Sequence, residues 1–210
     1  IRYENEKYKH ALTWYDEVKE KDLIPQERLE FLYTKAYSLL EMKKYAEAKK
    51  IFNSLSNEKN EYSNVATYYS AYIDYLQKNN KSALNGFLKI EETEEYKDIV
   101  PYYIVQIYYE EKEYKKSLEH GKKMLESNPN NKNNSEVYRI MGECAYRENV
   151  FNEAIVYFGK YEKLAKKLQR NSSYMYGMSF FQEKDYVNAV KYLTRATNPE
   201  DSIAQNAYLH

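Results

Sequence analysis

A short block of residues returns six times along the chain at nearly constant spacing. It reads Lys-Tyr-Ala-Glu-Ala at 44–48, Glu-Tyr-Lys-Lys-Ser at 113–117 and Asp-Tyr-Val-Asn-Ala at 185–189. A small residue closes each copy: Ala11, Ala48, Ala83, Ser117, Ala154 and Ala189. The steps between them are 37, 35, 34, 37 and 35 residues. Such a period is typical of repeat proteins, in which each unit buries its apolar face only against its neighbours.

Each copy opens a helical pattern. Tyr45, Ala48, Phe52 and Leu55 are spaced by 3, 4 and 3 residues, which places them on one face of an α-helix. A second apolar-periodic stretch, such as 138–146, precedes each copy, so each unit is predicted to be a helix–turn–helix. The small residue lets a neighbouring helix come close, and we therefore expect it to be buried.

These residues resemble the tetratricopeptide repeat (TPR) family, whose consensus is 34 residues long. Met141-Gly142 and Gly177 with Phe180 are similar to its first helix, and Ala48-Phe52, Ala83-Phe87 and Ala154-Phe158 to its second. The consensus Trp is absent, the inter-helix turns lack Gly, and Ser117 and Gly121 replace Ala and a large aromatic. The resemblance covers the whole chain and implies an all-α fold, a right-handed α-solenoid of antiparallel helix pairs.

The consensus phase divides residues 1–210 into one TPR array. We expect a partial repeat at 1–22, full repeats at about 29–62, 64–97, 98–131, 135–168 and 170–203, and a truncated first helix at 203–210. The native protein is then expected to be longer, and the cut ends, including Tyr208 and Leu209, could self-associate. The segments 8–18 and 204–210 also resemble large TPR proteins of the Bacteroidota. This implies a periplasmic or cell-envelope location; a cytoplasmic one is the alternative.

Composition and charge argue against several classes of partner. Lys and Arg together number 32 and Asp and Glu also number 32, so net charge does not favour nucleic acid. No apolar run approaches the roughly 20 residues of a membrane span, so no direct membrane insertion is expected. With 43% hydrophobic and 16% aromatic residues the chain can build a core.

The sequence shows no pattern that predicts catalysis. His10, His120 and His210 are scattered without a second metal ligand at i+4, and Cys144 has no His base placed beside it. The chain's 5 glycines form neither a phosphate-binding loop nor a dinucleotide fingerprint. We therefore expect no enzyme, no metal and no cofactor.

The family resemblance implies a concave face lined by the first helices. Its 30 positions carry 11 Tyr, against 26 Tyr in the 210-residue chain, and Arg139 is the one cation at its fifth and ninth positions. The candidate peptide-binding residues are Tyr33, Tyr37, Tyr68, Tyr69, Tyr72, Tyr75, Tyr102, Tyr103, Tyr109, Arg139, Tyr146 and Tyr174. Tyr combines an apolar body with a hydrogen-bonding tip, which suits binding surfaces. The same rings could instead serve only to pack helices together, and both interpretations stay open.

The sequence thus predicts a non-catalytic scaffold that binds a peptide or protein partner on a Tyr-rich groove. With Arg139 as the one cation at the fifth and ninth repeat positions and no Asn at the ninth, the groove is not expected to clamp a chaperone's terminal carboxylate as some TPR domains do. Two alternatives remain: a structural spacer within a longer envelope protein, or a module that targets a catalytic domain elsewhere in that protein.

Overall fold

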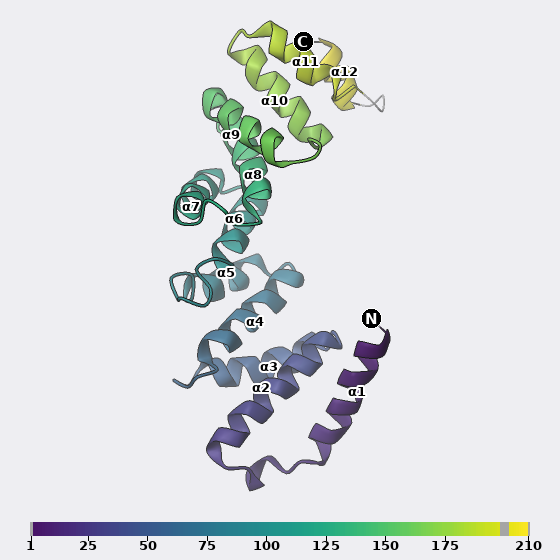
Figure 1. Ribbon diagram of the computed structural model, residues 1–210, viewed down its shortest axis with the longest axis vertical. Coiled ribbons are helices and arrows are strands. Elements are labelled where there is room, and N and C mark those ends of the chain that lie inside the picture. Colours follow the sequence, from purple (N-terminus) through teal and green to yellow (C-terminus); the bar gives the residue numbers. More distant parts are fainter. Residues whose placement is uncertain (1, 198–201, 210) are drawn as a thin grey trace. The chain divides into compact units, whose positions relative to one another are not determined.

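The computed structural model describes residues 2–197 and 202–209, and this part of the chain is helical with no strand (Figure 1). The helices are α1 (Arg2–Glu17), the 3-10 helix η1 (Glu20–Asp22), α2 (Pro25–Glu41), α3 (Tyr45–Ser56), α4 (Ser63–Leu76), α5 (Asn80–Leu88), α6 (Val100–Glu110), α7 (Tyr114–Ser127), α8 (Asn134–Arg147), α9 (Phe151–Leu164), α10 (Arg170–Gln182), α11 (Tyr186–Thr194) and α12 (Ser202–Leu209). Within this part, no helix is both long enough and apolar enough to span a bilayer.

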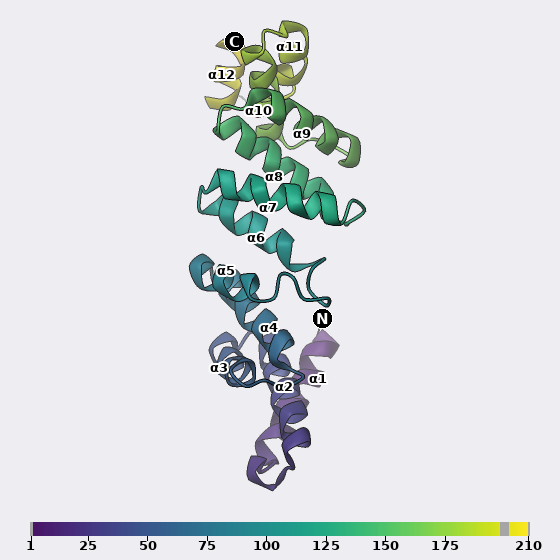
Figure 2. The same ribbon diagram turned by 90° about the vertical axis from the view of Figure 1, so that its left-hand side faces the viewer.

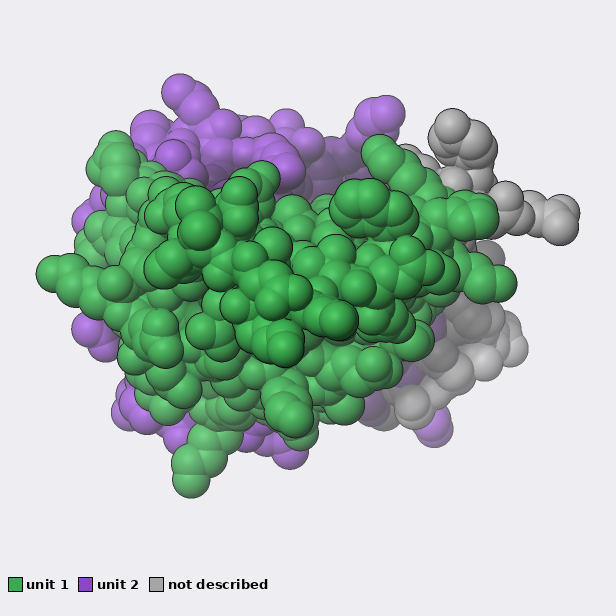
Figure 3. Space-filling view, turned by 90° about the horizontal axis from the view of Figure 1, so that it is seen from below, with its two compact units in different colours: residues 1–97 green, residues 98–210 purple. Residues whose placement is uncertain are grey.

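The chain forms two compact units, residues 1–97 and 98–210, which are coloured separately in Figure 3. In the first unit, each of the helices α1 to α4 packs on the next, as far as α5. In the second unit, each of the helices α6 to α10 packs on the next, as far as α11. Helix α8 also contacts α6 and α10. The arrangement as one continuous array stays a prediction.

The helices form antiparallel pairs joined by short turns, as the two views of the ribbon show (Figures 1 and 2). The pairs are α2–α3, α4–α5, α6–α7, α8–α9 and α10–α11, and each predicted full repeat overlaps one of them. Helix α1 lies in the predicted partial repeat and α12 in the predicted truncated one. The all-α class with antiparallel pairs is confirmed. The side chains of Tyr208 and Leu209, and all of His210, lie outside the described residues, so the self-association prediction is not addressed.

Five of the six small residues of the repeat lie in the core, as predicted, whereas Ala11 in α1 is only partly buried. Ala48, Ala83 and Ala154 are fully buried, and Ala189 is nearly so. Ser117, which replaces Ala, is also buried, and its hydroxyl donates to the Val105 carbonyl at 3.0 Å. This bond offsets the cost of burying a hydroxyl. One turn further on, three of the second helices bury an aromatic ring completely: Phe52, Phe87 and Phe158. Burial of each such ring contributes about 1.5–3 kcal/mol.

The glycines mark the closest helix crossings. None has a positive φ, so the reason for glycine is space rather than backbone conformation. A Cβ on Gly142 would lie 2.7 Å from the Phe158 ring, and one on Gly177 would lie 2.9 Å from the Leu193 backbone nitrogen. A Cβ on Gly86 would lie 2.7 Å from the Ala71 Cβ. Real Cβ atoms essentially never approach so closely, so alanine at any of these positions would push two helices apart.

Gly121 in α7 lies closer to its neighbours than its helical position indicates. From its helical position alone, alanine is expected to be neutral or stabilising, because glycine costs about 1 kcal/mol in a helix interior. In the structure an added Cβ would lie 2.8 Å from the Sδ of Met141, and Met141 is fully buried. Close packing therefore accounts for this glycine, and the gain in helix propensity is opposed by displacement of a core side chain.

Two glycines in the same helix pair allow a matched test. Gly142→Ala forces the methyl group onto the buried Phe158 ring and is expected to lower stability by about 1–3 kcal/mol. Gly159→Ala places its Cβ 3.2 Å from the Tyr176 hydroxyl alone, and is expected to be neutral or to stabilise by up to about 1 kcal/mol. Urea unfolding measures both. Equal effects from the two substitutions would contradict this account of the crossing.

A residue in left-handed conformation ends the first helix of every pair. These residues are Lys43, Lys78, Lys112, Asn149 and Lys184, with φ between 58° and 64°. At Lys112 the backbone N–H donates to the Tyr109 carbonyl at 3.0 Å, and the next N–H donates to Tyr108 at 2.8 Å. The same two bonds recur in all five turns and define the Schellman motif, where glycine is the usual residue. The repeat thus reproduces a turn geometry without the glycine that normally favours it.

Replacing one of these lysines by glycine should therefore stabilise the chain. A left-handed L-residue costs about 1–2 kcal/mol, whereas glycine adopts this conformation freely. Lys112→Gly is expected to raise the free energy of unfolding by up to about 1 kcal/mol. Lys112→Ala removes the same side chain but keeps the unfavourable φ, so it should leave stability nearly unchanged. If the alanine variant gains as much as the glycine variant, conformational strain at this turn is not the cause.

Candidate functional site

All twelve candidate residues lie on the first helices of the five pairs, and all are partly exposed. We call this set the first-helix face. Helix α2 carries two of them, α4 four, α6 three, α8 two and α10 one. The full set is Tyr33, Tyr37, Tyr68, Tyr69, Tyr72, Tyr75, Tyr102, Tyr103, Tyr109, Arg139, Tyr146 and Tyr174. Each side chain therefore packs on one side and meets solvent on the other.

In the first unit the tyrosines of α2 and α4 form one connected cluster. The rings of Tyr33, Tyr37 and Tyr69 lie in mutual contact, with centroid distances of 5.5–6.5 Å. Tyr62, from the turn before α4, stacks on Tyr33 at 5.1 Å. Aromatic pairs in such geometry contribute about 0.5–1.5 kcal/mol beyond their area burial. The cluster thus joins two successive first helices while leaving part of each ring accessible.

The cluster continues along α4. Tyr68 meets Tyr69 edge-on at 5.2 Å and lies parallel to Tyr72 at 6.0 Å. Tyr96, from the segment after α5, stacks on Tyr68 at 4.9 Å. The sequence prediction did not include Tyr62 and Tyr96, because they belong to turns rather than to first helices. Their separation of 34 residues, one repeat length, is the signal that could have identified them.

Carboxylates surround this cluster. Burial and the neighbouring Glu41 raise the pKa of Tyr37 to about 12. Burial, together with Tyr33 and Glu95, raises the pKa of Tyr96 to about 12. Burial also raises the pKa of Tyr62, with Glu61 and Glu30 contributing. The hydroxyls of Tyr37, Tyr62 and Tyr96 therefore stay protonated at neutral pH and can donate hydrogen bonds.

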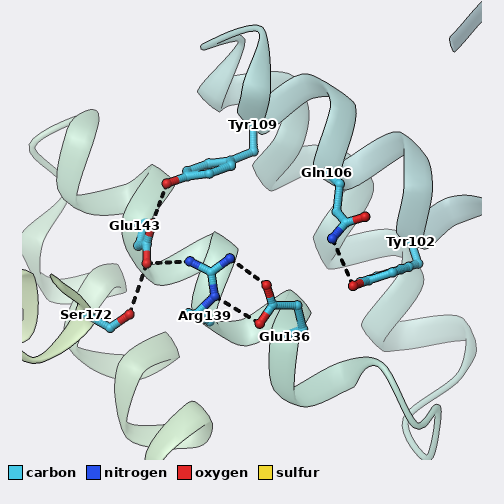
Figure 4. A network of polar contacts seen from close by, with 7 residues as sticks. All are labelled: Tyr102, Gln106, Tyr109, Glu136, Arg139, Glu143 and Ser172. Atoms are coloured by element: carbon cyan, nitrogen blue, oxygen red, sulfur yellow. Dashed lines mark hydrogen bonds and ion pairs between the residues drawn. The ribbon is translucent and has the colours of Figure 1, made fainter. Parts of the chain in front are cut away.

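In the second unit the first-helix face carries a polar network (Figure 4). The guanidinium of Arg139 donates to Glu136 through Nε at 2.9 Å and Nη2 at 2.5 Å, and to Glu143 through Nη1 at 2.6 Å. Glu143 is 3% exposed and also accepts hydrogen bonds from the hydroxyls of Tyr109 and Ser172. One buried carboxylate thus has donors from α6, α8 and α10 (Figure 4).

The hydrogen bonds of this network fix the guanidinium of Arg139 against its own helix. Burial opposes its charge, but the hydrogen bonds to Glu136 and the charge of Glu143 raise the pKa of Arg139 above its usual range. Burial and the hydrogen bond to Glu143 raise the pKa of Tyr109. A buried carboxylate is costly unless its lone pairs are satisfied, and here three donors satisfy them. The sequence prediction treats Arg139 as a cation that faces a partner, whereas in the structure two carboxylates of its own helix bind it.

The remaining candidates of the second unit pack against neighbouring side chains. Tyr102 accepts a hydrogen bond from Gln106 at 2.9 Å, and its ring lies 5.7 Å from that of Tyr103. Tyr146 contacts the Phe151 ring edge-on at 5.9 Å, and Tyr174 packs against the buried core of the second unit. The second unit therefore has no aromatic cluster on this face comparable to that of the first among its described side chains.

Outside this face, the His and Cys side chains that could bind a metal or act in catalysis do not form a common site in the part of the chain that the structure describes. Among the described side chains, no group of three or more His, Cys, Asp or Glu could hold a metal ion. The His120 ring packs beside Tyr108 at 5.2 Å. Cys144 is fully buried, and burial raises the pKa of its thiol to about 12, so it is a poor nucleophile.

Comparison with solved structures identifies the fold. YrrB, described as a TPR protein with an unusual peptide-binding site, superposes with a TM-score of 0.72 at 17% identity, over 89% of this chain and 94% of YrrB. MamA from AMB-1 gives 0.69 at 14% identity, over 88% and 98%. MamA residues 41–end from Desulfovibrio magneticus RS-1 gives 0.66 at 14% identity, over 83% and 97%. This is the TPR fold. No family model and no curated protein matches the chain by sequence.

The first and second helices differ in how far they bury their aromatic side chains. The second helices supply the fully buried aromatics Phe52, Phe87 and Phe158, whereas the candidate tyrosines of the first helices are partly exposed. Tyr186 shows that tyrosine also occurs off this face, since it starts the second helix α11 and is 57% exposed. It provides a matched control for variants of the first-helix face.

The tyrosine cluster of the first unit predicts a loss of stability in alkali. The pKa of Tyr37 and of Tyr96 is raised from 10.0 to about 12, and that of Tyr69 is raised as well. A raised folded-state pKa stabilises the fold fully below the unfolded value, and this contribution is lost as pH rises from about 10 through the folded value. The urea midpoint should therefore fall steeply above pH about 10.

The double variant Tyr37→Phe with Tyr69→Phe should show a shallower fall, because phenylalanine cannot ionise. Tyrosinate absorbance should rise with the unfolding transition in the wild-type protein. Tyr186→Phe serves as the control and should leave the alkaline slope unchanged. An identical slope in the double variant would show that these hydroxyls do not couple to folding.

Proposed function

We propose that the chain is a non-catalytic scaffold that binds a peptide or protein segment on its first-helix face. The observation that carries this proposal is the uniform exposure of the candidate tyrosines. All of them are partly exposed, none is fully buried, and none is solvated on all sides. Tyr in this intermediate state offers apolar area and a hydroxyl at low entropic cost, which favours partner contact.

The fold supports the proposal at a general level. TPR helices present a row of parallel first helices, and side chains on such a row can meet an extended or helical ligand. YrrB is described as a TPR protein with a peptide-binding site, and its structure resembles this chain over most of its length. We extend peptide binding from that likeness to this chain as part of the proposal.

A cell-envelope location is part of the same proposal, and the resemblance to large envelope TPR proteins supports it. A scaffold in that compartment would bring exported proteins together. The location affects which partner meets the face, but it does not alter the chemistry of the face itself.

The first-helix face can be tested with peptides selected from a random display library against the wild-type chain. Tyr72→Ala in α4 and Tyr103→Ala in α6 are measured separately for peptide affinity. Truncation of an aromatic at the centre of an interface costs about 2 kcal/mol or more, roughly thirtyfold in Kd. We expect a loss of this size from at least one variant with the melting temperature preserved.

Tyr186→Ala removes an exposed tyrosine from a second helix and should leave affinity unchanged. Where an alanine variant melts early, Tyr72→Phe or Tyr103→Phe keeps the ring and isolates the hydroxyl. Unchanged affinity in every first-helix variant would remove the binding proposal and favour the spacer alternative.

A further inference from the structure

The chemistry of the aromatic cluster in the first unit indicates what kind of peptide fits it. We call the cluster with its surrounding carboxylates the Tyr–Glu surface. Its rings are Tyr33, Tyr37, Tyr62, Tyr68, Tyr69 and Tyr96, and its carboxylates are Glu30, Glu41, Glu61 and Glu95. All four carboxylates are exposed, whereas all six rings are partly buried.

Helix α2 shows the arrangement in its simplest form. Gln26, Glu30, Tyr33, Tyr37 and Glu41 are spaced by 4, 3, 4 and 4 residues and lie on one side of the helix. This side carries two carboxylates and no cation. A ligand that contacts the two tyrosine rings therefore lies between two negative charges.

Three cations of the first unit form ion pairs with other carboxylates. The Lys35 ammonium lies 3.0 Å from Asp16, Arg28 lies 2.7 Å from Glu20, and Lys97 lies 2.6 Å from Glu94. Among the described side chains, neither Lys nor Arg forms an ion pair with the four carboxylates of the Tyr–Glu surface. Glu61 accepts a hydrogen bond from Gln26 and Glu41 one from Tyr37, so Glu30 and Glu95 are the carboxylates most available to a ligand.

The electrostatic environment of the rings agrees with this geometry. The charged groups that act on Tyr37, Tyr62 and Tyr96 are Glu41, Glu61, Glu30 and Glu95, all negative. The surface therefore combines electron-rich ring faces with fixed negative charge. Both features attract a cation, and they act together when the cation lies over a ring beside a carboxylate.

We propose that the Tyr–Glu surface binds a basic peptide segment, with arginine side chains preferred over lysine. The inference rests on the proposed function, since it names the ligand class for part of the same face. A guanidinium stacks flat on tyrosine while its edge bonds a carboxylate in bidentate fashion, and an ammonium cannot do both. The same negative charge repels the phosphates of nucleic acids and anionic membranes.

The test uses the 210-residue chain and three short peptides of equal length: alternating Arg-Gly, Lys-Gly and Glu-Gly. Fluorescence anisotropy at low ionic strength gives each Kd. The Arg-Gly peptide should bind most tightly, Lys-Gly more weakly, and Glu-Gly not measurably. Added salt should weaken Arg-Gly binding, because exposed charges are screened within about 10 Å at 0.1 M.

The variant Glu30→Gln with Glu95→Gln removes two carboxylates for which the structure shows no side-chain hydrogen bond. It should weaken Arg-Gly binding about fivefold, the size expected from loss of exposed charge pairs. The control Glu119→Gln with Glu126→Gln removes two exposed carboxylates of α7 and changes net charge equally. It should leave binding unchanged.

The outcomes separate this inference from the proposed function. Equal binding of Arg-Gly and Glu-Gly peptides, or equal effects of the two double variants, overturns the charge inference. In that case, loss of library-peptide affinity in Tyr72→Ala would still support the first-helix face. If the tyrosine variants keep full affinity for library peptides while Arg-Gly binding depends on Glu30 and Glu95, the general proposal fails and the local basic-peptide site stands.

Discussion

The packing of every helix pair in this chain depends on how closely its two helices approach each other. Ala48, Ala83, Ala154 and Ala189 leave room for a facing helix, and a bulkier side chain at these positions would hold the helices apart. Only at this separation do rings such as Phe158 fill the space beside Gly142 without a void. The second helix buries one side of the first, and the opposite side becomes the face that carries the tyrosines.

The two units join their successive first helices by different means. In the first, aromatic rings of α2 and α4 pack on each other, an interaction that tolerates small shifts because it is weakly directional. In the second, Glu143 accepts hydrogen bonds from Tyr109 of α6 and Ser172 of α10, which requires defined distances. The first unit thus exposes an adaptable aromatic surface, while the second holds its charged groups in internal bonds.

The repeat spacing predicted the helix pairs and the buried small residues, because backbone periodicity and volume are local properties. Gly142 and Gly177, which match the first helix of the TPR consensus, lie at close helix crossings. The pairing of Arg139 with Glu136 and Glu143 could not be predicted, since it depends on rotamers and on which of several acids comes within reach. The left-handed lysines were missed because lysine gives no signal for a positive φ.

Gly121 illustrates the limit of helix propensity as a guide, because its neighbour Met141 lies 20 residues away in the sequence.

The thiol of Cys144 can report local unfolding of the second unit around α8. It is the chain's one thiol, it is fully buried beside Met141 and Ala145, and burial raises its pKa to about 12. An alkylating reagent can therefore reach a reactive thiolate only when α8 separates from its neighbours. The rate at which the native protein is labelled would give the free energy of that local opening, with no engineered probe and no competing site.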